Sequence, residues 1–173
     1  MASILNVDEI KTASGTAAKI DVHGFSVAVI ADQKANNVDA GTSSVGWNDR
    51  DLNTEIFDPD GIVSISSNQF TLGAGTYIIE FSAPAYRSGR HITQLYDVTN
   101  STSVQDGSIS YTHTTYAGFN HSFGSARVSI TANTTYKIRH HCEASYATNG
   151  LGIKSTASGT VSIYTQVKIT KLA

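Results

Sequence analysis

A period of two in side-chain type constrains the fold of this chain more than any other feature. The clearest case is residues 161–170, Val-Ser-Ile-Tyr-Thr-Gln-Val-Lys-Ile-Thr, and segments 126–130 and 135–142 alternate similarly. The positions expected on one face are Val161, Ile163, Thr165, Val167 and Ile169. Because neighbouring residues of a strand point to opposite faces, this pattern predicts β-strands with one buried face.

Turn signals separate these runs from others that are rich in β-branched and aromatic residues. In Asp58-Pro-Asp-Gly, Pro59 presets φ and Gly61 accepts a left-handed exit, so we expect a turn. Further strand-like runs cover residues 25–31, 62–65, 70–82 and 94–98. Helical periodicity is scarce, and its best candidate, residues 13–20, is weakened by Ser, Gly and Thr. Many short strands in 173 residues predict an all-β domain, a jelly-roll β-sandwich.

The first 24 residues differ in character from the rest of the chain. They contain too few large apolar side chains to bury a core of their own. We therefore predict an extended N-terminal arm, residues 1–24, followed by a head domain, residues 25–173. The arm's expected anchoring contacts are Ile4, Leu5, Val7 and Ile10. The alternative is a disordered tail, because chain termini are often loose.

Composition excludes several classes of function. The net charge of −2 does not provide the basic surface that nucleic-acid binding requires, so we expect no nucleic-acid partner. No apolar run approaches the roughly 20 residues of a membrane span, and the N-terminus lacks the basic start and apolar block of a signal peptide. The single cysteine, Cys142, excludes an intramolecular disulfide and a cysteine-rich zinc site.

Candidate metal ligands are too few on any one strand face. In the strand expected over 135–142, His140 and Cys142 share a face and His141 points the other way. A site within one chain would have to recruit His23, His91, His113 or His121, whereas a three-fold axis could gather three copies of one histidine. We expect ordinary structural or surface histidines, with no metal and no cofactor.

Catalytic motifs are equally scarce, and we expect the protein not to be an enzyme. There is no Gly-x-Ser-x-Gly motif around a serine nucleophile. The acidic residues of segment 49–60 could supply a glycosidase carboxylate pair, but a solvated loop accounts for them more simply. Asp58 and Asp60 resemble the start of a calcium loop, but its later ligands are missing, so the turn is favoured.

Two segments, 86–91 and 111–123, mix aromatic rings with Arg, His and Asn. Such mixtures suit binding, because rigid rings stack while small polar groups hydrogen-bond. We therefore hypothesise a receptor-binding surface at one end of the head. Its residues are Tyr86, Arg87, Arg90, His91, Tyr116, Phe119 and His121. The alternative is that Tyr111, Tyr116 and Phe119 lie on a strand and pack inward or on a trimer axis.

The middle of the chain resembles a known family. Phe70-Thr71 followed by Gly75-Thr76-Tyr77 is similar to the start of a core strand in the globular-head jelly rolls of complement and tumour-necrosis-factor type. The Arg50-x-Leu52-Asn53 element and the closing β-run resemble versions in tailed-phage virion proteins. The opening residues 1–17 are similar to the starts of phage fibre chains. A collagen-like Gly-X-Y stalk is missing, which disfavours the secreted animal branch.

This resemblance implies a homotrimeric, non-enzymatic structural protein of the phage virion. We expect a tail-fibre-type subunit whose arm attaches to other virion proteins of the tail and whose head contacts a glycan or protein on the host surface. The alternative is a capsid decoration (cement) protein whose arm grips the shell of the phage head. A third hypothesis, a carbohydrate-binding enzyme module, requires a convergent carboxylate pair.

Overall fold

The alternating segments form antiparallel strands in a computed structural model, which describes residues 25–172. The predicted arm, with Ile4, Leu5, Val7 and Ile10, therefore lies outside the described residues. Twelve strands and no helix occur within residues 25–172, so no helix there could span a membrane. The prediction of an all-β sandwich is confirmed.

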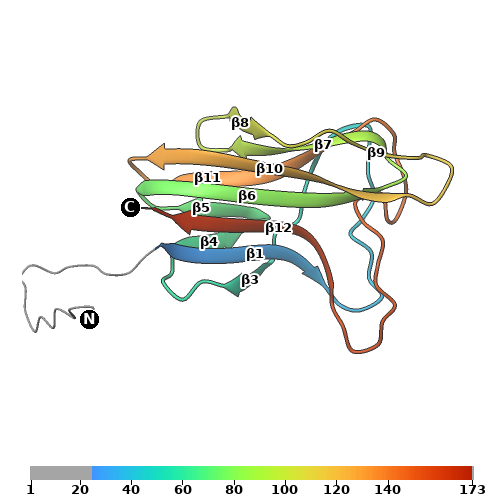
Figure 1. Cartoon of the computed structure of the whole chain (residues 1–173), viewed down its shortest axis with the longest axis horizontal. Helices are drawn as coiled ribbons and strands as arrows, with labels where there is room; N and C mark the ends of the chain where they lie inside the picture. Colours follow the sequence, from blue (N-terminus) through green and yellow to red (C-terminus); the bar gives the residue numbers. More distant parts are fainter. Residues whose placement is uncertain (1–24, 173) are drawn as a thin grey trace, which may run out of the picture.

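Five strands form the first sheet, in the order β10-β6-β12-β1-β3 (Figure 1). Their bounds are β1 Ser26–Lys34, β3 Thr54–Phe57, β6 Gly75–Tyr86, β10 Phe119–Ile130 and β12 Ser162–Lys171. β6 and β10 pair along their whole lengths, from Phe119 opposite Tyr86 to Ile130 opposite Gly75. The outward face of this sheet is therefore long and regular along these two strands.

The second sheet contains seven strands, in the order β4-β5-β11-β7-β8, with β2 paired to β11 and β9 paired to β7. Their bounds are β2 Gly46–Asp49, β4 Val63–Ser66, β5 Gln69–Leu72, β7 Gly89–Asp97, β8 Thr102–Asp106, β9 Ser110–Thr112 and β11 Thr134–Cys142. The predicted Asp58 turn joins β3 to β4, and Gly61 has a φ of 62°. The Asp58 carboxylate accepts the backbone N–H groups of Ile62 and Val63, which fixes this turn.

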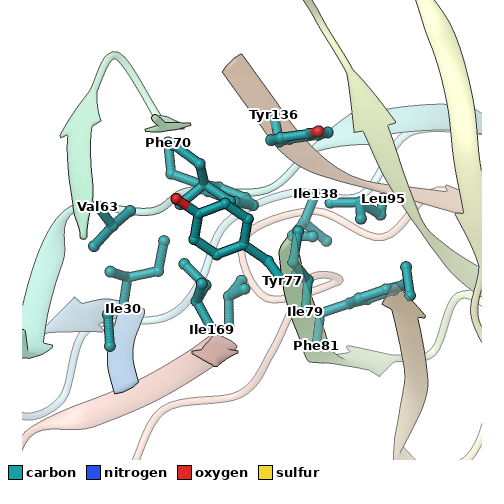
Figure 2. Packing of buried hydrophobic residues seen from close by; sticks show 14 of the residues in the cluster. Ile30, Val63, Phe70, Tyr77, Ile79, Phe81, Leu95, Tyr136, Ile138 and Ile169 are labelled. Carbon is teal, nitrogen blue, oxygen red and sulfur yellow. The ribbon is translucent and has the colours of Figure 1, made fainter. Parts of the chain in front are cut away.

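An apolar core fills one half of the space between the sheets, and Figure 2 shows how its side chains pack against one another. The rings of Phe70 and Tyr136 stack with centroids 5.6 Å apart. Tyr77 is buried beside them, and its hydroxyl donates to the carbonyl of Gly73 over 3.0 Å. Each buried ring or large aliphatic side chain contributes about 1.5–3 kcal/mol, so this half supplies most of the hydrophobic stabilisation.

The other half of the interior is mainly polar, with one small apolar cluster of Ala40, Cys142, Leu151 and Tyr164. Its fully buried polar side chains include Arg50, His91, Thr93, Ser122, His140 and Thr165. They lie toward the end of the sandwich where β7 begins and β11 ends, since His91 pairs with Cys142 there. The second half therefore depends on hydrogen bonding, because a buried polar group without a partner destabilises the fold.

The face predicted for residues 161–170 is only partly correct. Thr165, Val167 and Ile169 are buried, but Val161 and Ile163 are 46% and 41% exposed. The register between β1 and β12 shifts between Ala31 and Gln33, where two residues of β12 lie opposite one of β1. Such a bulge reverses the faces on either side of it.

The two ends of the sandwich differ (Figure 1). At one end, Ser26 pairs with Lys171, and the Leu172 N–H donates to the carbonyl of Thr76. The described chain therefore starts and finishes at the same end. The loops 35–45, 113–118 and 143–161 gather at the opposite end, which we call the loop end.

Candidate functional site

Three rings lie in a row on the outward face of β10. Phe119, His121 and Phe123 occupy alternate positions, and their ring centroids are 5.1 and 5.8 Å apart. Phe119 is 47% and Phe123 60% exposed. This aromatic row is unusual for a solvent-facing strand surface and marks the face as a candidate interface.

A hollow of about 430 Å³ lies beside the row, on the outward face of the first sheet. Its lining comes from β6, β10 and β12: Glu80, Phe81, Ser82, Phe123, Gly124, Ser125, Gln166 and Lys168. Lys168 and Glu80 form an ion pair at 3.0 Å on the same face. We call this hollow the sheet hollow; its lining combines phenylalanine rings with small side chains, a glutamine and this ion pair.

Gly124 leaves room on the inward face of β10 for a core ring. A Cβ atom on Gly124 would lie 2.1 Å from the ring of Phe81, which packs on the inward side. Phe81 is almost fully buried and belongs to the apolar core. The glycine thus lets a core ring fill the space under the aromatic row.

At the loop end, His113 organises the loop between β9 and β10. Its Nδ1 accepts the backbone N–H groups of Thr115 and Tyr116 over 3.0 and 3.1 Å. The rings of His113 and Tyr116 are 4.7 Å apart, and Tyr111 lies edge-on to His113 at 6.4 Å. Tyr116 is 71% exposed, so the loop presents a ring to solvent on a hydrogen-bonded support.

Arg90 lies close to this loop, beside a second hollow of about 430 Å³. Ile109, Ser110 and Tyr111 line the hollow together with Arg90. The Arg90 guanidinium and backbone N–H both contact the Glu143 carboxylate, at 2.8 and 2.9 Å. The carboxylate holds the arginine in place and leaves most of the side chain exposed.

Tyr86 and Arg87 form a structural clamp. Tyr86 is buried edge-on against Tyr146, with centroids 5.5 Å apart. The Arg87 guanidinium carbon lies 5.3 Å from both ring centroids, and its Nη1 donates to the Tyr146 hydroxyl over 2.6 Å. Both side chains fasten the turn between β6 and β7 to the loop after β11.

The seven hypothesised recognition residues therefore divide into two groups. Arg90, Tyr116 and Phe119 are exposed, and His121 is half-buried within the aromatic row. Tyr86 and His91 are buried, which corrects their placement on a recognition surface, and Arg87 is half-buried in the clamp with Tyr86. Phe123 and Tyr111 were not among the seven. The period of two in Phe119, His121 and Phe123 is the sequence signal that predicts the row.

His91 and His140 face each other inside the sandwich. The Nδ1 of His91 lies 2.9 Å from the Nε2 of His140. Burial is the main cause that lowers the pKa of His91 to about 4, and the charge of Arg50 is the second cause. The same two causes lower the pKa of His140 well below its ordinary value. Both rings are therefore neutral near pH 7.

The structure also locates the candidate metal ligands, the cysteine thiol and the acidic residues that the sequence singled out. His91 does join the face shared by His140 and Cys142, but within residues 25–172 no three His, Cys, Asp or Glu side chains gather to hold a metal ion. Burial raises the pKa of the Cys142 thiol, which disfavours the nucleophilic thiolate. Of the acidic residues 49–60, Asp49 pairs with Lys137 and Asp51 with Lys34.

No protein-family model matches this chain, and no curated protein matches it. Among solved structures, it is similar to murine APRIL at pH 5.0: 8% identity, 86% of this chain and 99% of that chain covered, TM-score 0.56. It is also similar to Eiger TNF from S. frugiperda: 12% identity, 87% and 94% covered, TM-score 0.54. These likenesses show the fold alone, so the predicted jelly-roll β-sandwich is confirmed.

Proposed function

We propose that this chain is a homotrimeric structural protein of a tailed-phage virion, a tail-fibre-type subunit without enzymatic activity. Its arm, residues 1–24, attaches to other virion proteins, and its loop end contacts the host surface. The observation that carries the proposal is the polarity of the head. The described chain starts at one end, and loop 113–118, which carries the exposed ring of Tyr116, lies at the other (Figure 1).

This polarity suits an attachment protein. Phe25 and Ser26 stand at the end remote from loop 113–118, so a segment that precedes them can dock without covering that loop. A scaffold that anchors at one end and presents loops at the other keeps both contacts independent.

Trimerisation is supported by the aromatic row and the sheet hollow. Phe123 is a large exposed ring beside small side chains, Ser82 and Ser125, and this combination fits the packing of another copy of the same chain. The occupant that we propose for this face is a neighbouring copy in a ring of three. The resemblance to jelly rolls of the tumour-necrosis-factor type implies the same number.

Host contact is supported by the loop-end residues Arg90, Tyr111 and Tyr116. Their rings and guanidinium group are exposed beside a hollow, and His113 and Glu143 hold them in place. Tyrosine and arginine are the residue types that dominate binding hot spots. Preorganised rings of this kind suit the faces of sugars or a protein surface.

Removing residues 1–24 is expected to abolish incorporation of the protein into phage particles and to leave the head folded. Strand β1 begins at Ser26, so the sheets remain intact and β-type circular dichroism persists. Incorporation is measured by immunoblot of purified particles, and immunogold electron microscopy locates the full-length protein.

A full-length variant with Ile4, Leu5, Val7 and Ile10 all changed to Ser is expected to be lost from particles as well. Its matched control, with Asn6, Thr12 and Thr16 changed to Ser, is expected to be retained. Immunogold label on the tail supports the proposal. Label on the capsid shell instead favours the alternative, a capsid decoration protein. Absence of the full-length protein from particles refutes any virion role.

Tyr116→Ala is expected to lower the rate of adsorption to host cells by about tenfold, the effect of losing one hot-spot residue. Because Tyr116 is mostly exposed, the melting temperature is expected to stay within a degree or two of the parent. The matched control is Phe57→Ala, another exposed ring, at the far edge of the first sheet. Normal adsorption by stable Tyr116→Ala and Arg90→Ala particles would remove the host-binding role.

A further inference from the structure

The polar half of the core contains an arginine whose charge is not neutralised by direct contact. Arg50 follows β2, is 1% exposed and extends its side chain between the two sheets. Within residues 25–172, no carboxylate lies within ion-pair distance of its guanidinium group. The buried Asp32 carboxylate pairs instead with Lys34, over 3.1 Å. Enclosing such a charge costs several kcal/mol unless it has partners.

The guanidinium group is only partly satisfied by hydrogen bonds. Its Nε donates to the hydroxyl of Thr165 on β12 over 2.8 Å, and its Nη1 donates weakly to the carbonyl of Pro84 on β6 over 3.4 Å. Its Nη2 is buried and has no partner. The guanidinium is still protonated near pH 7, because burial lowers the pKa of Arg50 only to about 10.

The histidine pair has unsatisfied atoms of its own. His91 and His140 share one hydrogen bond, between Nδ1 and Nε2, and their other nitrogens, His91 Nε2 and His140 Nδ1, are buried without partners. In a neutral pair, one ring donates to the other. Of the two remaining nitrogens, one therefore carries a proton and is a donor, while the other is an acceptor.

A series of contacts between neighbouring strands places these groups in one layer of the interior. Pro84, which accepts from Arg50, pairs with His121 on β10. The next residue, Ser122, shares a hydrogen bond of 2.8 Å with Thr93 on β7. Thr93 in turn pairs with His140 on β11.

The last contact in this series connects β11 to the backbone of Arg50. His140 is two residues beyond Ile138, whose carbonyl accepts the backbone N–H of Arg50 over 2.9 Å. Four strands and the segment after β2 thus surround the Arg50 guanidinium and the imidazole pair.

We propose that this interior site binds a small monovalent anion of the halide class. The anion accepts hydrogen bonds from Nη2 of Arg50 and from the free imidazole N–H of the histidine pair. One negative charge balances the guanidinium and leaves the neutral pair neutral. A cation is disfavoured by the same guanidinium. The inference is independent of any role in a virion.

The test compares the urea unfolding of the purified protein in sodium chloride and in sodium gluconate at equal ionic strength and protein concentration. A ligand that binds only the folded state divides the unfolding equilibrium constant by one plus the ligand concentration over Kd. Chloride is therefore expected to lower this constant by about tenfold once its concentration is about nine times Kd. Arg50→Met is expected to lose the difference, and Arg127→Met, an exposed arginine on β10, to keep it.

Crystals of the parent protein grown in sodium bromide provide a second measurement, which holds even if Arg50→Met does not fold. An anomalous peak is expected within hydrogen-bond distance of Nη2 of Arg50. Equal stability in chloride and gluconate, or no peak at that position, overturns the proposal in favour of water. Equal halide stabilisation of the parent and a folded Arg50→Met also overturns it, because the ion then acts elsewhere.

Discussion

In light scattering at micromolar concentration, the parent protein is expected to have a mass near three times 18.4 kDa, and Phe123→Asp is expected to have the mass of a single chain. Phe123 is 60% exposed on the outward face of the first sheet, so a carboxylate there is solvated in the free chain. In the proposed trimer it is buried against a neighbouring copy without a partner. An uncompensated buried charge of this kind costs several kcal/mol for each of three interfaces.

The matched control is Trp47→Asp. Trp47 is also an exposed ring, but it lies on β2 of the second sheet and packs edge-on against His141. This variant is expected to remain trimeric. A parent that stays monomeric across micromolar concentrations contradicts the trimer, and a trimeric Phe123→Asp places the interface elsewhere.

Acidification from pH 7 to pH 4 is expected to destabilise the head through His91 and His140. Burial lowers the pKa of His91 to about 4, against an ordinary value of 6.5 in the unfolded chain. Between these values the unfolded state binds more protons, so the contribution is complete above about pH 6.5 and is lost as the pH falls toward 4. For His91 alone the loss amounts to about 3 kcal/mol, since one pKa unit corresponds to about 1.4 kcal/mol.

His140 adds to this loss, because its pKa is lowered in the same direction by burial and by Arg50. Asp32 has the opposite sign: burial raises the pKa of its carboxyl above 3.8, which favours the folded state as this group takes up its proton. Asp32 affects the unfolding free energy at the acid end of this pH range, whereas the histidines dominate its change between pH 6.5 and 5.

The measurement is urea unfolding at pH 7, 6, 5 and 4, with chloride and protein concentration fixed. His91→Gln is expected to flatten the pH dependence above pH 5. His113→Gln, at an exposed histidine of the loop end, is expected to keep it. A parent whose unfolding free energy is constant from pH 7 to 5 would show that the pair does not take up protons on unfolding.

The strands that the sequence predicted best are those with clear alternation and local turn chemistry. Residues 135–142 appear as β11, and the run 70–82 divides at the expected glycine turn into β5 and β6. Pro59 and Gly61 specify their turn through their own backbone preferences. Such signals are local, so they can be read from the sequence without knowing which strands lie next to one another.

The faces of β12 were harder to predict, because they depend on a partner strand. Val161 and Ile163 continue the same period as Val167, yet the bulge opposite β1 separates them. Nothing in residues 161–170 marks the extra residue, since a bulge is a property of two strands.

The candidate site shows the same division. The residue types of segments 86–91 and 111–123 indicated an aromatic and cationic surface, and Tyr116 and Phe119 are indeed exposed. Tyr86 and His91 have the same chemistry but are covered by Tyr146 and His140, which are far away in the sequence. Composition could not separate the two groups.

By itself, the sequence determined the fold class, the turns and the residues able to fill an apolar core, because each follows from local periodicity and backbone preference. Only the tertiary structure decided that Arg50, His91 and His140 share one buried layer and that Phe119 and Phe123 face outward. Both outcomes depend on which sheet covers which face. That choice is made by long-range pairing and packing, and no short segment encodes it.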